Sequence, residues 1–329
     1  MLLFLLIVLT LGSGCVMTGG SAGTTPAPSP TTTSFVIVET ETAAQDPVPA
    51  TLVPTVNATP AITAAAVPPR DVLESGGEKK PFEYSIRTRS QLLYYTTYDG
   101  VRDYLRDRYP DRPTDFYNIS TLEDYYRQYV SDPVQKSYLD AFVENVNDRS
   151  TLRPDRARIA VSLIQHIPYA ETARTLYPYE VLYYDMGKCE DKSILMAYVL
   201  SDMGYGTALL LYYPEHHMAL GLKCPKQYSI GQSGYCFVET TTPSIMTFHN
   251  GSYTGIGKLT STPEIIRISD GDSFDQISEE YADALTFDAV LNSARWDENG
   301  MYLDTFNYDQ MGYLRQKYGL FEIDPLSVS

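Results

Sequence analysis

Three residues in the middle of the chain have the side chains that a nucleophilic catalyst needs. Cys189 opens a long apolar run that indicates a buried helix, and a thiol at a helix N-terminus is favoured as thiolate by the helix dipole. His217 can accept the thiol proton, because an imidazole titrates near neutral pH. Glu239 can hold that imidazole in the right tautomer. This order of residues predicts covalent catalysis by a cysteine.

Side-chain alternation along two strand-like segments predicts how these residues face each other. His217 shares one strand face with Ala219 and Gly221, whereas the large apolar residues of the segment point the other way. A face with a histidine and two small residues lets a helix approach closely. We therefore expect the Cys189 helix to pack on this face, and Glu239 on the next strand to face it too.

The other cysteines indicate a disulfide rather than a metal site. The chain has four cysteines and no C-x-x-C pair, which excludes a cysteine zinc knuckle. Cys224 and Cys236 flank a short connection between two predicted strands, and both fall on the face opposite to His217 and Glu239. We expect them to form a disulfide, since the chain has the features of an exported protein.

Hydrophobic periodicity predicts helices on both sides of these strands. Helical spacing, interrupted by prolines, covers 99–109, 120–131, 133–148 and 156–167. The Cys189 helix extends to Met203, with Gly204 as its cap. Strands follow at 207–213, 217–224 and 235–241, and the tail at 274–291 and 301–318 is predicted to be helical. We find no internal repeat.

The remaining histidines allow other interpretations. His216 could replace His217 as the base, although strand parity favours His217. His166 and His249 are expected to be structural or solvated. A metal site made of Cys189, His217 and His249 is conceivable, but its spacing is not typical of any metal motif, so we expect no metal.

The motifs around these residues resemble those of the transglutaminase-like cysteine enzymes, which belong to the papain-like group. The similarity is to a microbial surface branch and covers about 100 residues; its motifs are YPYEVL at 177–182, GKCEDKS at 187–193, HMALGL at 217–222 and YCFVETT at 235–241. It implies an α+β fold with a catalytic helix packed on an antiparallel sheet, and a triad of Cys189, His217 and Glu239. Lys188, Val181 and Glu239 replace the acid, threonine and aspartate that are usual at these positions.

The resemblance also indicates a region for an oxyanion donor. Related enzymes supply this donor from the segment just before the catalytic helix, where this chain has Gln165 and Tyr169. Packing at a helix end is an equally good interpretation of both residues. Glu190 and Asp191 are expected to stabilise the helix N-terminus.

The N-terminal residues indicate export. The apolar run from Met1 to Leu11 is shorter than the roughly 20 residues that span a bilayer, and it suits a secretory signal. Small residues before Cys15 resemble a lipoprotein processing site, with Cys15 as the lipidated residue. A plain signal peptide or an uncleaved short anchor is the alternative. Residues 16–80 are rich in Thr, Pro and Ala, which predicts a disordered linker.

Charge limits the partners. The net charge of −16 repels phosphate backbones and anionic lipid surfaces, so we expect no nucleic-acid binding. A protein or peptide substrate at the cell surface and a membrane contact through the N-terminus are expected. No cofactor is implied, and the sequence gives no indication of oligomeric state.

These observations predict five segments with one enzymatic core. They are a signal or lipidation segment at 1–15, the linker at 16–80, a helical segment at 81–155, the transglutaminase-like core at 156–268 and a C-terminal helical segment at 269–329. We expect a membrane-anchored surface enzyme that cleaves peptide or amide bonds through a thioester. Amine transfer uses the same triad, and a non-catalytic binding or scaffold module on the same fold is the alternative.

Overall fold

The apolar run that starts at Cys189 forms the central helix of the fold. In the computed structural model, which describes residues 67–115, 117–253, 257–297, 300–320 and 326–328, this helix is α7 (Cys189–Asp202). Its side chains from Ile194 to Leu200 are all buried, as the uninterrupted apolar run predicts. Residues 1–66, with Cys15 and most of the predicted linker, lie outside the described ranges.

A four-stranded antiparallel sheet packs against α7. Its strands are β3 (Gly206–Tyr212), β4 (His217–Lys223), β5 (Tyr235–Val238) and β8 (Glu264–Asp270), in the order β5-β4-β3-β8. The first three were predicted, although β5 ends at Val238, so that Glu239 begins the turn after the strand. Helix α7 contacts both β3 and β4.

The expectation about which sheet face meets α7 was wrong. Met218, Leu220 and Leu222 of β4 belong to the main core together with the α7 side chains, whereas Ala219 belongs to a smaller cluster on the other face. The large apolar side chains bury more area against a helix than small ones do, and this gain outweighs the closer approach that small residues allow. His217 therefore reaches the start of α7 from the end of its strand.

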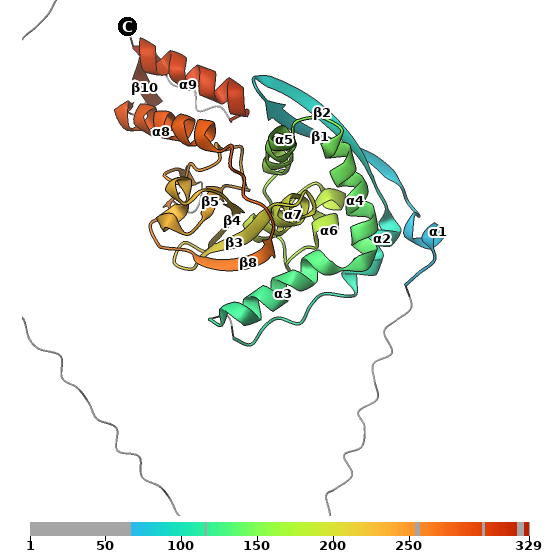
Figure 1. The fold of residues 1–329 in the computed structure, drawn as a ribbon. Coiled ribbons are helices and arrows are strands. Elements are labelled where there is room, and N and C mark those ends of the chain that lie inside the picture. Colours follow the sequence, from blue (N-terminus) through green and yellow to red (C-terminus); the bar gives the residue numbers. More distant parts are fainter. Residues whose placement is uncertain (1–66, 116, 254–256, 298–299, 321–325, 329) are drawn as a thin grey trace, which may run out of the picture. The chain divides into compact units, whose positions relative to one another are not determined.

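Helices cover the side of α7 away from the sheet (Figure 1). They are α2 (Asp99–Arg106), α3 (Ile119–Ser131), α4 (Pro133–Asn147), α5 (Arg153–His166) and α6 (Pro178–Tyr184). Helices α3 to α6 contact α7, and α3 also lies against the edge strand β8. Capping side chains set the starts of two of them. Asn118 accepts from the backbone N–H of Thr121, and Asp132 accepts from those of Val134 and Gln135.

A β-hairpin precedes these helices and was not predicted. It consists of β1 (Glu78–Ile86) and β2 (Arg89–Thr97), and the short helix α1 (Arg70–Leu73) comes before it. Ordered elements thus begin inside the range that was assigned to the linker, and the segment after residue 80 is not purely helical. The turn residues Arg87 and Thr88 have positive φ without glycine or asparagine, so no turn signal marks the hairpin. Packing of β1 on α5 stabilises it instead.

The C-terminal part combines helices with short strands. It contains α8 (Ser278–Ser293), β9 (Arg295–Asp297), β10 (Gly300–Asp304), α9 (Thr305–Tyr318) and β11 (Leu326–Val328). Helix α8 lies beside α9 (Figure 1). Residues 301–304 form a strand where a helix was predicted, and Asp304 caps α9 by accepting from the N–H of Asn307.

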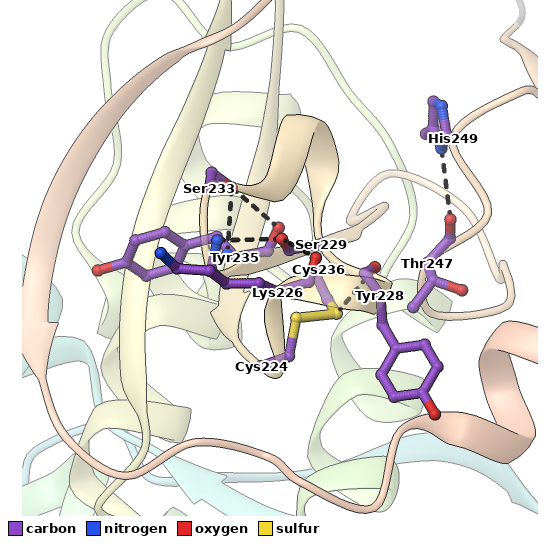
Figure 2. The surroundings of a disulfide bond; sticks show 10 residues. Cys224, Lys226, Tyr228, Ser229, Ser233, Tyr235, Cys236, Thr247 and His249 are labelled. Atoms are coloured by element: carbon purple, nitrogen blue, oxygen red, sulfur yellow. Dashed lines mark hydrogen bonds between the residues drawn. A yellow bond between two sulfur atoms is a disulfide. The ribbon is translucent and has the colours of Figure 1, made fainter.

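Cys224 and Cys236 form the predicted disulfide (Figure 2). Their Cα atoms are 5.8 Å apart, within the range that a disulfide needs. The bond joins the end of β4 to β5 beside two short 3₁₀ turns, Lys226–Tyr228 and Ile230–Gln232. The minor strands β6 (Ser252–Tyr253) and β7 (Gly257–Lys258) pair with each other.

The predicted α+β class is confirmed, with helices and mainly antiparallel sheets. Within the described ranges, no helix combines the length and the apolarity needed to cross a bilayer.

Candidate active site

Cys189 is the first residue of α7 and lines a large cleft. Asp191 caps the helix by accepting the backbone N–H of Lys188 at 3.1 Å, so the first turn is well formed. The cleft has a volume of about 1380 Å³ and is also lined by residues 165–169, by the turn after β5 and by α8. Cys189 is partly exposed, and it is the free cysteine of the described residues. A thiol at this position meets both the cleft and the positive end of the helix dipole.

His217 and Glu239 form a buried pair beside Cys189. The Nε2 atom of His217 lies 3.0 Å from Oε2 of Glu239, and both side chains are fully buried. Burial opposes protonation of His217. Hydrogen bonds with the side chains of Cys189 and Glu239, and the charges of both groups, outweigh this and raise the pKa of His217 to about 9. With Nε2 held by Glu239, Nδ1 is the nitrogen that can exchange a proton with the thiol.

The two threonines after Glu239 fix its carboxylate. Oε1 accepts from the N–H of Thr240 at 3.0 Å, from the N–H of Thr241 at 2.8 Å and from the Thr241 hydroxyl at 2.6 Å. Burial opposes ionisation of Glu239, but His217 and Thr241 outweigh it and lower the pKa of the carboxyl group. The Glu-Thr-Thr sequence therefore has a local role: it leaves Oε2 free to face the imidazole.

Polar side chains of α7 attach β4 and the turn after β5 to the helix. Ser193 lies one turn after Cys189, and its hydroxyl donates to the Met218 carbonyl at 3.2 Å and bonds the Thr240 hydroxyl at 3.0 Å. Lys192, on the same side of the helix, is fully buried and donates to three backbone carbonyls. Neither residue was assigned from the sequence. The sequence feature that could have identified them is their position, since a lysine and a serine directly precede a long apolar run.

The acidic residues after Cys189 have partners in the preceding loop. Asp191 also accepts from the N–H of Leu176 and from the Thr172 hydroxyl, each at 2.8 Å. Glu190 accepts from the hydroxyls of Tyr126 at 2.9 Å and Thr175 at 3.0 Å. The two carboxylates thus do more than stabilise the helix N-terminus, because they also attach residues 172–176 and α3 to it.

The other histidines lie elsewhere. His216 is exposed, with a φ of 50° in the turn before β4, and it is His217 that pairs with Glu239. His249 is exposed, with Nδ1 3.5 Å from the Thr247 carbonyl oxygen (Figure 2), and Nδ1 of His166 lies 2.7 Å from the Ser162 carbonyl oxygen. The alternative metal site is not formed, since the described residues contain no group of three or more His, Cys, Asp or Glu side chains suited to a metal ion.

Gln165 and Tyr169 both line the cleft near Cys189, and the donor groups of both already have acceptors within the protein. The Gln165 amide donates to the carbonyls of Glu239 at 2.8 Å and Ser244 at 3.2 Å, which uses both of its hydrogens. Tyr169 pairs with Gly187 through a β-bridge, is half exposed, and donates its hydroxyl to Glu171. Its hydroxyl is the more exposed of the two, but its single hydrogen is donated to Glu171, so both candidate oxyanion donors are engaged in this structure.

Comparison with known proteins adds no family assignment. No family model matches the chain, and a search of curated proteins gives no significant match. The chemistry of the site is therefore inferred from its own geometry.

Proposed function

We propose that this protein is a transglutaminase-like cysteine enzyme that hydrolyses peptide or amide bonds through Cys189, His217 and Glu239. The main support is the buried His217–Glu239 pair, together with a cysteine that begins a helix on an open cleft and whose side chain helps to raise the pKa of His217. Two further features agree with the proposal: α7 packs on an antiparallel sheet, and the three residues follow the order of that enzyme group.

The reaction that fits these residues has two steps. His217 takes the proton of Cys189, and the sulfur attacks the carbonyl carbon of the substrate. The negative oxygen that forms is stabilised by N–H groups of the first turn of α7, which have no partner inside the helix. His217 then gives its proton to the leaving amine, which departs as the thioester forms.

Water is the proposed acceptor of the acyl group. His217 removes a proton from water, the hydroxide attacks the thioester, and Cys189 leaves with a proton. The cleft, at about 1380 Å³, exceeds the roughly 300–1,000 Å³ that is usual for small-molecule pockets. This size favours a polypeptide substrate and open access for water over an amine channel that excludes water.

We further propose that the enzyme is exported and anchored to the cell surface through Cys15 or a short N-terminal segment. The support is the apolar run of residues 1–11, the small residues before Cys15 and the Thr/Pro/Ala-rich linker. A disulfide in the catalytic core agrees with an oxidising environment.

A peptide library, assayed with and without a primary amine, tests the activity. Peptide cleavage that is lost in both C189A and H217A is expected, with the double variant no worse than either single variant because the two residues act in one step. Amine incorporation in place of cleavage would change the assignment to a transferase. Unchanged cleavage in C189A would exclude Cys189 as the nucleophile, and an inert wild-type thiol would favour a binding module.

A further inference from the structure

Lys192 is a charged residue in the centre of the fold. It lies on α7 one turn after Cys189, and its side chain has no solvent exposure. Its Nζ atom donates to the backbone carbonyls of Gln165 at 3.2 Å and Thr241 at 3.1 Å, and also to that of Ile167. Burying an amine is unfavourable unless its donors are satisfied, so this position has a specific requirement for lysine.

The three carbonyls belong to the segments that meet at the thiol. Gln165 and Ile167 end α5 and lead to the cleft wall at Tyr169, and Thr241 belongs to the turn that presents the Glu239 carboxylate. The same turn is also held by Gln165, whose amide donates to the Glu239 carbonyl at 2.8 Å. Lys192 thus connects the catalytic helix directly to the main chain around Glu239.

Three carbonyl acceptors require three hydrogens, and only the protonated amine supplies three. The charged groups that act on Lys192 are Glu239, on the turn after β5, and Asp185, which follows α6, and both favour the protonated form. Burial acts in the opposite direction and is the larger effect, so the pKa of Lys192 is lowered to about 7.

Among Cys189, His217, Glu239 and Lys192, the charges balance only when Lys192 is protonated. The buried carboxylate of Asp191 has its own donors, the N–H groups of Lys188 and Leu176 and the Thr172 hydroxyl. In the active form, Cys189 and Glu239 are negative and His217 is positive, which leaves one negative charge without compensation. A protonated Lys192 supplies the missing positive charge. An apolar residue at this position would leave the charge uncompensated and remove the donor from the buried carbonyls of Gln165 and Ile167 and from the partly buried carbonyl of Thr241.

We infer that Lys192 is a positioning residue for the His217–Glu239 pair, which its ammonium group holds against the first turn of α7. This inference rests on the proposed role of Cys189 as a nucleophile. Lys192 does not touch the substrate in this account, and it acts through the turn that carries Glu239.

The test uses the full chain and the rate of Cys189 alkylation by iodoacetamide, measured by peptide mapping at pH 6 and pH 9. The readout is the rate at pH 6 divided by the rate at pH 9. This ratio reports how the thiolate forms, and it is insensitive to general changes in access to the cleft. A free thiol, with a pKa of about 8.5, reacts roughly 200-fold more slowly at pH 6 than at pH 9. A thiolate held by protonated His217 reacts at similar rates at both values.

We expect K192M to lower this ratio at least about tenfold relative to wild type, toward the free-thiol value. K188M is the matched control: Lys188 also precedes the α7 core but is partly exposed and paired with Glu190, so its ratio should stay close to that of wild type. If K192M does not fold, K192Q, which keeps two N–H donors without the charge, should show the reduced ratio.

A wild-type ratio in a folded K192M or K192Q variant would overturn the role of Lys192 while leaving the proposed function intact. An equal loss in K188M would also overturn it, because any nearby positive charge would then suffice. A free-thiol ratio in the wild-type protein would refute the proposed function and the inference together.

Discussion

The most specific consequence of the site geometry concerns E239Q. From sequence alone this change looks mild, since glutamine keeps the length of glutamate and one acceptor. In the structure, however, Oε1 of Glu239 accepts from the N–H groups of Thr240 and Thr241 and from the Thr241 hydroxyl. Three donors at one position hold the glutamine oxygen there, because an amide NH₂ group cannot accept from them. The NH₂ group of glutamine must then face His217.

This orientation reverses the hydrogen bond to the imidazole. The amide N–H would donate to Nε2 of His217, which forbids a proton on Nε2 and therefore disfavours the imidazolium form. The pKa of His217, raised to about 9 in the wild-type protein, should fall in E239Q, because the hydrogen bond and the charge of Glu239 are among the causes that raise it. Each unit by which this pKa falls corresponds to about 1.4 kcal/mol of lost imidazolium stabilisation.

The alkylation ratio between pH 6 and pH 9 measures this effect directly. In E239Q, we expect the rate at pH 6 relative to that at pH 9 to be at least about tenfold lower than in the wild-type protein. It should approach the value of a free thiol, which reacts roughly 200-fold more slowly at pH 6 than at pH 9. Turnover should be lost nearly as completely as in H217A, because the remaining tautomer carries its proton on Nδ1 and cannot act as a base toward Cys189. H216A is the control, since His216 is exposed and should leave the ratio unchanged. A wild-type ratio in E239Q would refute the argument from the fixed carboxylate.

Three other predictions follow from the fold, the site and the N-terminal sequence. Replacing Cys224 and Cys236 together by serine should lower the free energy of unfolding by about 2–3 kcal/mol in chemical denaturation, while equal stability with and without reductant would contradict this. Because the pKa of His217 is raised to about 9, the NMR signals of its imidazole should titrate near pH 9, and a titration centred near 6.5 would show an ordinary histidine instead. Intact-mass analysis of the native protein should show loss of the first 14 residues and a lipid on Cys15, and an unmodified N-terminus at Met1 would rule this out.

The sequence predicted the parts of the fold that depend on local patterns. The apolar run after Cys189 identifies α7, and strand alternation places Cys224 and Cys236 as partners, which the disulfide confirms. The hairpin at 78–97 was missed because its turn lacks glycine and its stability comes from packing on α5, which is a non-local contact. The packing face of β4 was misjudged for a similar reason, since buried area outweighed close approach.

The candidate triad could be named from residue order, but the groups that hold it could not. Lys192 and Ser193 have no motif of their own, and their roles depend on backbone carbonyls and hydroxyls that come from segments distant in sequence. Gln165 was considered for its side-chain donors, and the structure places those donors on the carbonyls of Glu239 and Ser244. Contacts of this kind follow from the tertiary fold and are not visible in spacing or periodicity.

The central claim is that Cys189 is an activated nucleophile, and its pH–rate profile with iodoacetamide tests this most directly. In the wild-type protein we expect the rate to change little between pH 6 and pH 9, because His217 remains protonated and holds a thiolate beside it. A rate that rises roughly 200-fold over this range, as for a free thiol with a pKa of about 8.5, would show that Cys189 is not activated and would contradict the account.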